Sequence, residues 1–122
     1  MIEIGGLVWE TFARINPLGS SFTTAQTQMM QHDQQRVTAF IENPSSVTVY
    51  VSHLSNPTTT NAIVLAANGG SYTLNFRDDG EMVTLPIFGL TNSGTQTLWL
   101  METILLTPWH EVQRILREMR GK

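Results

Sequence analysis

Apolar and polar side chains alternate through the middle of this chain with a period of two, which is typical of strands that bury one face. Val47, Val49 and Val51 are separated by hydroxyl-bearing residues, and Tyr72 and Leu74 lie in a similar alternating run. The same alternation, or a short apolar run between turn residues, recurs along the chain. It predicts strands over residues 21–28, 36–42, 46–53, 62–66, 71–77, 82–90 and 95–105.

Turn-forming residues separate these predicted strands. Asp78-Asp79-Gly80 is typical of a tight hairpin turn, because aspartate and glycine tolerate positive φ. Asn68-Gly69-Gly70 is also interpreted as a hairpin turn, and Pro86 within the strand at 82–90 favours an edge position or a bulge. A chain of 122 residues fits one domain. The sequence therefore predicts a mainly β, antiparallel β-sandwich or jelly-roll-like domain.

Residues 1–19 do not follow the alternation and are predicted to form an N-terminal arm or a short helix. Trp9, Phe12 and Ile15 have helix-like spacing, but Gly5-Gly6 precedes them. These large apolar side chains need burial, and each stabilises the protein by about 1.5 to 3 kcal/mol when it is fully covered. The sequence leaves two covers open, the chain's own sandwich or a neighbouring subunit.

Residues 107–121 are predicted to form a C-terminal amphipathic helix after the sandwich core at 20–106. Thr107 offers a hydroxyl N-cap, and Pro108 suits the first helical turn. Apolar residues then recur at helical spacing: Trp109, Val112, Ile115, Leu116 and Met119. The predicted strand at 95–105 is apolar on both faces, so its outer face needs a cover. The helix is expected to dock either on its own sheet or on a partner.

Charge is distributed unevenly along the chain. Residues 1–106 carry eight acids and three bases, whereas residues 107–122 carry two acids and four bases. The spacing of three places Arg114, Arg117 and Arg120 close together on the helix, where they favour a solvated or protein-docking surface. Nucleic-acid binding is not expected, because the net charge is −3 and no aromatic residues interleave with these arginines.

The sequence predicts no enzyme, and no catalytic residue, metal site or cofactor. It contains no cysteine and no Gly-x-Ser-x-Gly motif. His32, His53 and His110 form no metal-ligand pair and are interpreted as surface or loop histidines. The predicted turn explains the acidic residues around Gly80, so calcium binding is not expected. Because the sequence shows no secretory signal and no apolar run long enough to span a bilayer, a soluble protein without membrane contact is expected.

Binding of a carbohydrate or a cell-surface glycan is the alternative function. Aromatic rings suited to stacking on sugars are present: Trp9, Trp99, Trp109, Tyr50 and Tyr72. Packing of the helix on the sheet explains Trp99 and Trp109 without any ligand. Sugar binding is therefore the second hypothesis.

Three runs of residues carry a resemblance to a known class of proteins: Arg36-Val37-x-x-x-Ile41-x-Asn43-Pro44-Ser45, Val49-Tyr50-Val51, and Ile63-Val64-Leu65-x-x-Asn68-Gly69-Gly70-x-Tyr72-Thr73-Leu74. In this layout the chain resembles small β-sandwich virion proteins of tailed bacteriophages, such as capsid decoration and tail-associated components. The resemblance implies a non-enzymatic structural protein in many copies. Its partners would be itself and other virion proteins, and its location the virion, after assembly in the host cytoplasm.

The terminal segments lie outside this resemblance and are predicted to join copies into a homo-oligomer. The mechanism would be the burial of apolar side chains between subunits, with the basic helix face beside them. The candidate interface residues are Trp9, Phe12, Ile15, Trp109, Val112, Ile115, Met119, Arg114, Arg117 and Arg120.

Overall fold

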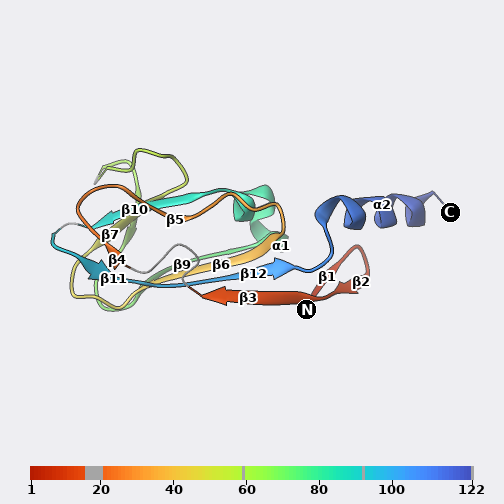
Figure 1. Ribbon diagram of the computed structural model, residues 1–122, viewed down its shortest axis with the longest axis horizontal. Coiled ribbons are helices and arrows are strands. Elements are labelled where there is room, and N and C mark those ends of the chain that lie inside the picture. The colour runs from red at the N-terminus through yellow and green to blue at the C-terminus, as the bar shows by residue number, and fades with distance from the viewer. Residues whose placement is uncertain (16–20, 59, 92, 122) are drawn as a thin grey trace.

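Two antiparallel four-stranded sheets pack face to face and confirm the predicted β-sandwich class (Figure 1). This computed structural model describes residues 1–15, 21–58, 60–91 and 93–121. The predicted end of the N-terminal arm at residue 19 and the last residue, Lys122, lie outside the described residues. No helix in the described part of the chain has the length and apolar character needed to cross a bilayer.

The first sheet has the strand order β3-β12-β6-β9, and the second has the order β5-β10-β7-β8. The strands of the first sheet are β3 (Thr11–Ile15), β12 (Trp99–Leu105), β6 (Arg36–Asn43) and β9 (Gly70–Asn75). Those of the second sheet are β5 (Thr27–Met30), β10 (Ile87–Thr91), β7 (Val49–Ser52) and β8 (Ile63–Leu65). Two small pairs complete the strands: β1 (Ile2–Ile4) with β2 (Leu7–Trp9), and β4 (Ser21–Phe22) with β11 (Gln96–Thr97).

The inward-facing residues of both sheets form the main core. The first sheet contributes Ile41, Leu74 and Leu100, and the second contributes Val51 and Ile87, all of them buried. Their alternation with more exposed neighbours follows the period that the sequence shows. The predicted strands at 21–28 and 95–105 are each interrupted, because β4 and β11 pair with each other as a separate short ladder.

The N-terminal segment is extended, so the structure resolves the choice between an arm and a short helix. Gly5 and Gly6 adopt positive φ values of 63° and 85° and form the turn between β1 and β2. After this hairpin, β3 pairs with β12 from Thr11 opposite Leu105 to Ile15 opposite Met101. Residues 11–15 of the predicted arm are therefore an edge strand of the sandwich itself.

The prediction of a hairpin turn at Asp78-Asp79-Gly80 is wrong. The segment forms a short helix, α1 (Phe76–Asp79), followed by a 3₁₀ helix, η1 (Gly80–Thr84). Asn75 caps α1, because its side chain accepts a hydrogen bond from the Asp78 N–H, and the Asp79 carboxylate accepts one from the Asn75 N–H. The following strand, β10, therefore begins only at Ile87, and Pro86 precedes it.

The interpretation of Asn68-Gly69-Gly70 as a hairpin turn is also wrong. β8 pairs with β7 in the second sheet, whereas β9 pairs with β6 in the first. The turn therefore carries the chain from one sheet to the other. Asn68 and Gly69 have positive φ values of 60° and 118°, which explains the residue types at this tight crossing.

Asn43 fastens this crossing from the end of β6. Its side chain is buried, and its amide nitrogen donates to the carbonyl oxygens of Val47, Leu65 and Ala66 at 2.8, 3.1 and 3.2 Å. Its amide oxygen accepts from the backbone N–H and the hydroxyl of Ser45. One side chain thus satisfies backbone groups of two separate loops.

We expect Asn43→Ala to lower the free energy of unfolding by about 1 to 3 kcal/mol, because the buried carbonyls lose their donor. A urea titration followed by tryptophan fluorescence measures this change. Asn56→Ala, in an exposed loop, is the control and should leave the midpoint unchanged. Equal midpoints for the two variants would show that Asn43 does not hold the crossing.

The C-terminal helix α2 (Trp109–Arg120) forms where it was predicted, but Thr107 does not cap it. The N-cap residue is Pro108, whose ring carries no hydrogen-bond acceptor. A glutamine from the loop before β6 supplies the missing acceptor instead: the Trp109 N–H donates to Oε1 of Gln35. The Gln35 Nε2 amide donates to the Thr107 carbonyl at 2.6 Å, so it anchors the start of the helix to the sandwich.

Candidate assembly surface

The β1–β2 hairpin and α2 pack against each other at one end of the sandwich (Figure 1). Their contact forms a second apolar cluster, whose buried members are Ile4, Trp9, Val37, Leu105 and Val112. Partly buried side chains pack around it: Ile2, Leu7, Phe76, Trp109, Ile115 and Leu116. We call the hairpin and α2 together the terminal module.

Close contacts fix the two parts of the terminal module. The Trp9 indole N–H donates to the Ile4 carbonyl at 3.1 Å and so braces the hairpin. A Cβ atom on Gly5 would lie 2.4 Å from a methyl carbon of Leu116, so the helix approaches the hairpin turn directly at a glycine. Phe76 of α1 meets Trp109 edge to face, with ring centroids 5.2 Å apart, and joins the module to the sandwich.

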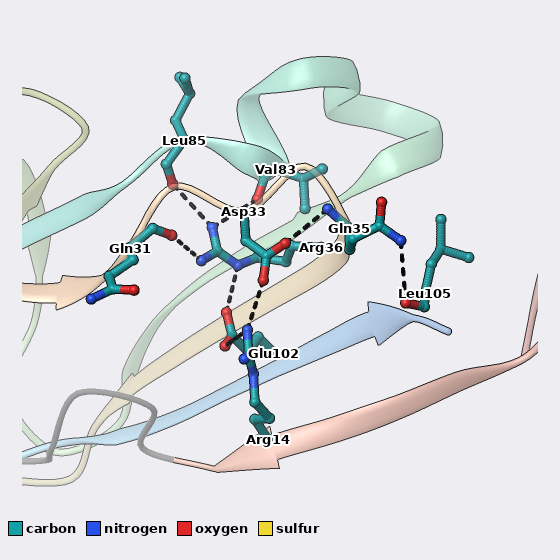
Figure 2. Close-up of polar contacts among 9 residues, drawn as sticks. All are labelled: Arg14, Gln31, Asp33, Gln35, Arg36, Val83, Leu85, Glu102 and Leu105. Carbon is teal, nitrogen blue, oxygen red and sulfur yellow. Dashed lines mark hydrogen bonds and ion pairs between the residues drawn. The ribbon is translucent and has the colours of Figure 1, made fainter. Parts of the chain in front are cut away.

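A buried ion network ties the edge strand β3 to the interior of the sandwich (Figure 2). The Arg36 Nε–H donates to Oε2 of Glu102 at 2.6 Å, and both side chains are only 1% exposed. Arg14 of β3 contacts the other oxygen of Glu102 and also Asp33, each at 2.7 Å. The remaining Arg36 donors reach backbone carbonyls of Gln31, Val83 and Leu85.

The network is structural, because its charged groups already bind one another. Both carboxylate oxygens of Glu102 face guanidinium groups, which leaves neither of them to act as a base toward a ligand. Sequence reasoning did not single out this pair. The sequence does contain a signal for it. Glu102 alternates in phase with the inward-facing Leu100 and Ile104, so it is buried, and a buried carboxylate requires a cation.

The outer face of the first sheet carries an apolar row that the described residues leave open. Ile15, Met101 and Phe40 lie opposite one another on β3, β12 and β6. Trp99 packs edge to face on Phe40, with ring centroids 5.6 Å apart. Ile15 is 60% exposed and Trp99 is 38% exposed. We call Ile15, Phe40, Trp99 and Met101 the outer row.

The helix does not supply the cover that the outer face requires. Figure 1 shows α2 beyond the end of the sheets, beside β1 and β2, and its buried residue Val112 belongs to the second cluster. The helix therefore packs within its own chain, against the β1–β2 hairpin and against Val37 and Leu105 at the end of the first sheet, and not across the outer face of that sheet. In the part of the chain that the structure describes, α2 therefore leaves Ile15 and Trp99 of the outer row exposed.

The structure divides the ten predicted interface residues into three groups. Trp9 and Val112 are buried in the second cluster, with Trp109 and Ile115 partly buried around them. Phe12, Ile15 and Met119 are exposed. The arginines lie on the exposed side of α2: Arg114, Arg117 and Arg120. Their role between copies stays a prediction.

The arginines of α2 differ in their pairing. Arg114 donates to Glu111 and to Glu118, each at 2.8 Å, and the hydrogen bond from Arg114 holds the pKa of the Glu111 carboxyl below its usual range. Arg117 and Arg120 make no ion pair with any residue that the structure describes. Two cationic groups at the last turns are therefore free for a partner.

His53 lies in the loop after β7, as the sequence predicted, and it also contacts residues next to both sheets. It follows β7, is partly buried, and places Nδ1 3.1 Å from the Pro86 carbonyl and Nε2 2.9 Å from the Tyr72 hydroxyl. A carbonyl only accepts, so Nδ1 carries a proton and donates it to Pro86. The other two histidines, His32 and His110, are exposed as predicted.

Tyr72 makes stability depend on pH in the alkaline range. Burial, and to a lesser extent the charge of Asp79, raises the pKa of its phenol above the ordinary value of 10.0. The stabilisation from the protonated phenol is complete below the unfolded pKa and is lost as the pH rises through the folded pKa. We expect Tyr72→Phe to lose less stability than wild type as the pH rises above 10.0. Denaturation curves at each pH test this, and parallel losses in the two proteins would contradict it.

Within the described residues, no group of histidine, cysteine and acidic side chains is placed to hold a metal ion. Asp78 and Asp79, which the sequence offered as oxygen ligands, use their carboxylates in the cap of α1.

No protein-family model matches the sequence, and no curated protein matches it. One solved structure with a similar chain comes from work on Bacillus and is described as "Bacillus endospore appendages form a novel family of disulfide-linked pili". The identity is 12%, the match covers 88% of this chain and 97% of that chain, and the TM-score is 0.46. The disulfides of those pili have no counterpart here, because this chain contains no cysteine.

Proposed function

We propose that this chain is a non-enzymatic structural protein that assembles in several copies. The observation that carries the proposal is the outer row, an apolar strip across three strands with Ile15 and Trp99 open to solvent. Burial of such a strip against a partner is favourable at roughly 25 cal/mol for each Å² of apolar surface. The buried charges of the interior are paired among themselves and point to stability rather than catalysis.

Sedimentation velocity over a concentration series tests this proposal. We expect wild type to sediment as a multimer, and Met101→Glu, which places a charge in the middle of the outer row, to shift it toward the monomer. Ser55→Glu, at an exposed position of the loop after β7, is the control and should sediment as wild type does. A wild-type monomer at every concentration would refute assembly.

More specifically, we propose that this structural protein is a component of a phage virion. Its support is the layout of the strands, in which β6, β7, β8 and β9 contain the three runs that resemble tailed-phage virion proteins. The partners would then include other virion proteins. Mass spectrometry of purified particles tests the assignment, and absence of the chain from intact particles would reject it.

Glycan binding is the second candidate, and the exposure of Trp99 favours it. An indole that is 38% exposed and braced by Phe40 is a rigid platform on which a sugar ring can stack. A glycan array with wild type and Trp99→Ala separates the two functions. Signals that vanish in Trp99→Ala would support glycan binding, and an empty array for wild type would exclude the glycans tested.

A further inference from the structure

We propose that α2 of one copy lies across the outer face of the β3-β12-β6-β9 sheet of the next copy, so that copies join head to tail. This inference rests on the proposed assembly function and names both sides of the contact. One side is the outer row together with Glu42. The other is the last turns of α2, with Met119, Arg117 and Arg120.

The sheet side of the contact has almost no charge. Register places eleven described residues on this outer face: Ala13, Ile15, Thr38, Phe40, Glu42, Ser71, Thr73, Asn75, Trp99, Met101 and Thr103. Among these described positions Glu42 is the one charged residue, and it lies directly opposite Trp99. Depletion of charge around an apolar centre is typical of the middle of a protein interface. The face is therefore suited to a partner with an apolar centre and a cation.

The helix side has the complementary composition. Met119 continues the apolar stripe of α2 but is 47% exposed, because the hairpin covers the stripe only farther back along the helix. Arg120 lines the same hollow of about 450 Å³ as Met119 and Leu116, and Arg117 lies one turn earlier. Neither arginine forms an ion pair with an acid in the described part of the chain. Glu42 forms no ion pair with a described basic residue either.

The dimensions of the two sides agree. A helix of twelve residues is about 18 Å long, and four strands at about 4.8 Å spacing span roughly 19 Å. The length of α2 is therefore comparable with the width of the sheet. A second copy is the occupant that the charges favour, since the body of this acidic chain carries the acid and its basic end carries the cations.

One chain cannot bring these two surfaces together. Glu42 pairs with Trp99 at the first residue of β12, whereas α2 follows the last residue of that strand. A strand of seven residues is about 24 Å long, and α2 extends away from it at the far end (Figure 1). Different surfaces at opposite ends give a heterologous contact, which builds a ring or an open chain of copies.

A charge exchange tests the contact. Glu42→Arg alone and Arg117→Glu/Arg120→Glu alone should each weaken self-association about tenfold or more, because like charges then meet at every contact. Mixing the two proteins should restore wild-type multimers, since the acidic helix of one variant fits the basic face of the other and the reverse contact keeps its native charges. Sedimentation velocity of each protein and of the mixture measures this. Arg77→Glu, an exposed arginine on α1, is the charge-matched control and should behave as wild type.

The outcomes separate this inference from the proposed function. Wild-type multimers that neither variant weakens, or a mixture that stays monomeric while both variants retain the helical circular dichroism signal, would overturn the head-to-tail contact and leave assembly standing. If the acidic helix loses that signal, Arg117→Gln/Arg120→Gln replaces it, and an undiminished multimer would again reject the contact. A monomeric wild type would reject both proposals.

Discussion

Glu102→Gln is expected to lower the free energy of unfolding by about 3 to 5 kcal/mol, the largest loss that a single polar substitution should cause in this chain. Arg36 stays charged and buried when Glu102, its one close anionic partner among the described residues, 2.6 Å away, becomes a neutral amide. The desolvation penalty of that guanidinium is then no longer offset. Urea denaturation measures the loss as a lower midpoint with an unchanged slope.

Two further variants identify the cause of that loss. Arg14→Gln removes the exposed partner of the same carboxylate and should cost less than about 1 kcal/mol, because solvent screens it. Arg36→Met/Glu102→Leu replaces the whole buried pair by apolar side chains and should recover most of the stability that Glu102→Gln loses. A Glu102→Gln midpoint equal to that of Arg14→Gln would show that the buried pair is not decisive.

The period of two was enough to predict the sandwich, and it also contained the position of the buried carboxylate. On β12 the residues Leu100, Glu102 and Ile104 share one phase, and the structure buries all three. The cation that makes this possible is 66 positions away in sequence, at Arg36. Local spacing carries no information about such a pair, because only the pairing of β6 with β12 brings it together.

Turn-forming residues gave a wrong prediction where a helix cap competed with a hairpin turn. Asp78-Asp79-Gly80 suits a hairpin turn in isolation, yet Asn75 offers a better alternative by capping a short helix. The helix N-terminus shows the same effect at long range, since Gln35 replaces the predicted Thr107 cap. The Asn75 bond is local, three residues along the chain, whereas the Gln35 bond depends on the folded chain because the two residues are 74 positions apart.

The sequence predicted which kinds of residue form the candidate surface, but it did not predict how they are arranged. Sequence spacing identified the apolar residues at both ends, but it gave no reason to pair the hairpin turn at Gly5 with Leu116. It also indicated that the outer face of β12 needs a cover. That α2 lies beyond the sheet instead depends on the second cluster, which joins residues near both ends of the sequence to Val37 and Phe76 from the middle of the chain.

Val112→Asp is expected to unfold α2 while the sandwich stays folded. Val112 is buried among Trp9, Leu105 and the other residues of the second cluster, so a carboxylate there must either lose its charge or leave the cluster. A helix of twelve residues is marginal in water without such packing. The main core draws on residues of the two sheets and does not include α2, so it should persist.

Hydrogen exchange measures this separation element by element. We expect the α2 amides of Val112→Asp to exchange about 100-fold faster or more, which corresponds to roughly 2.7 kcal/mol of lost opening energy, while β6 and β12 keep their protection. Gln113→Asp, the adjacent exposed position, is the matched control and should retain a protected helix. Loss of protection in the strands together with the helix would mean that the terminal module and the sandwich unfold as one unit. In that case the surface proposed for assembly could not be altered at α2 without loss of the fold.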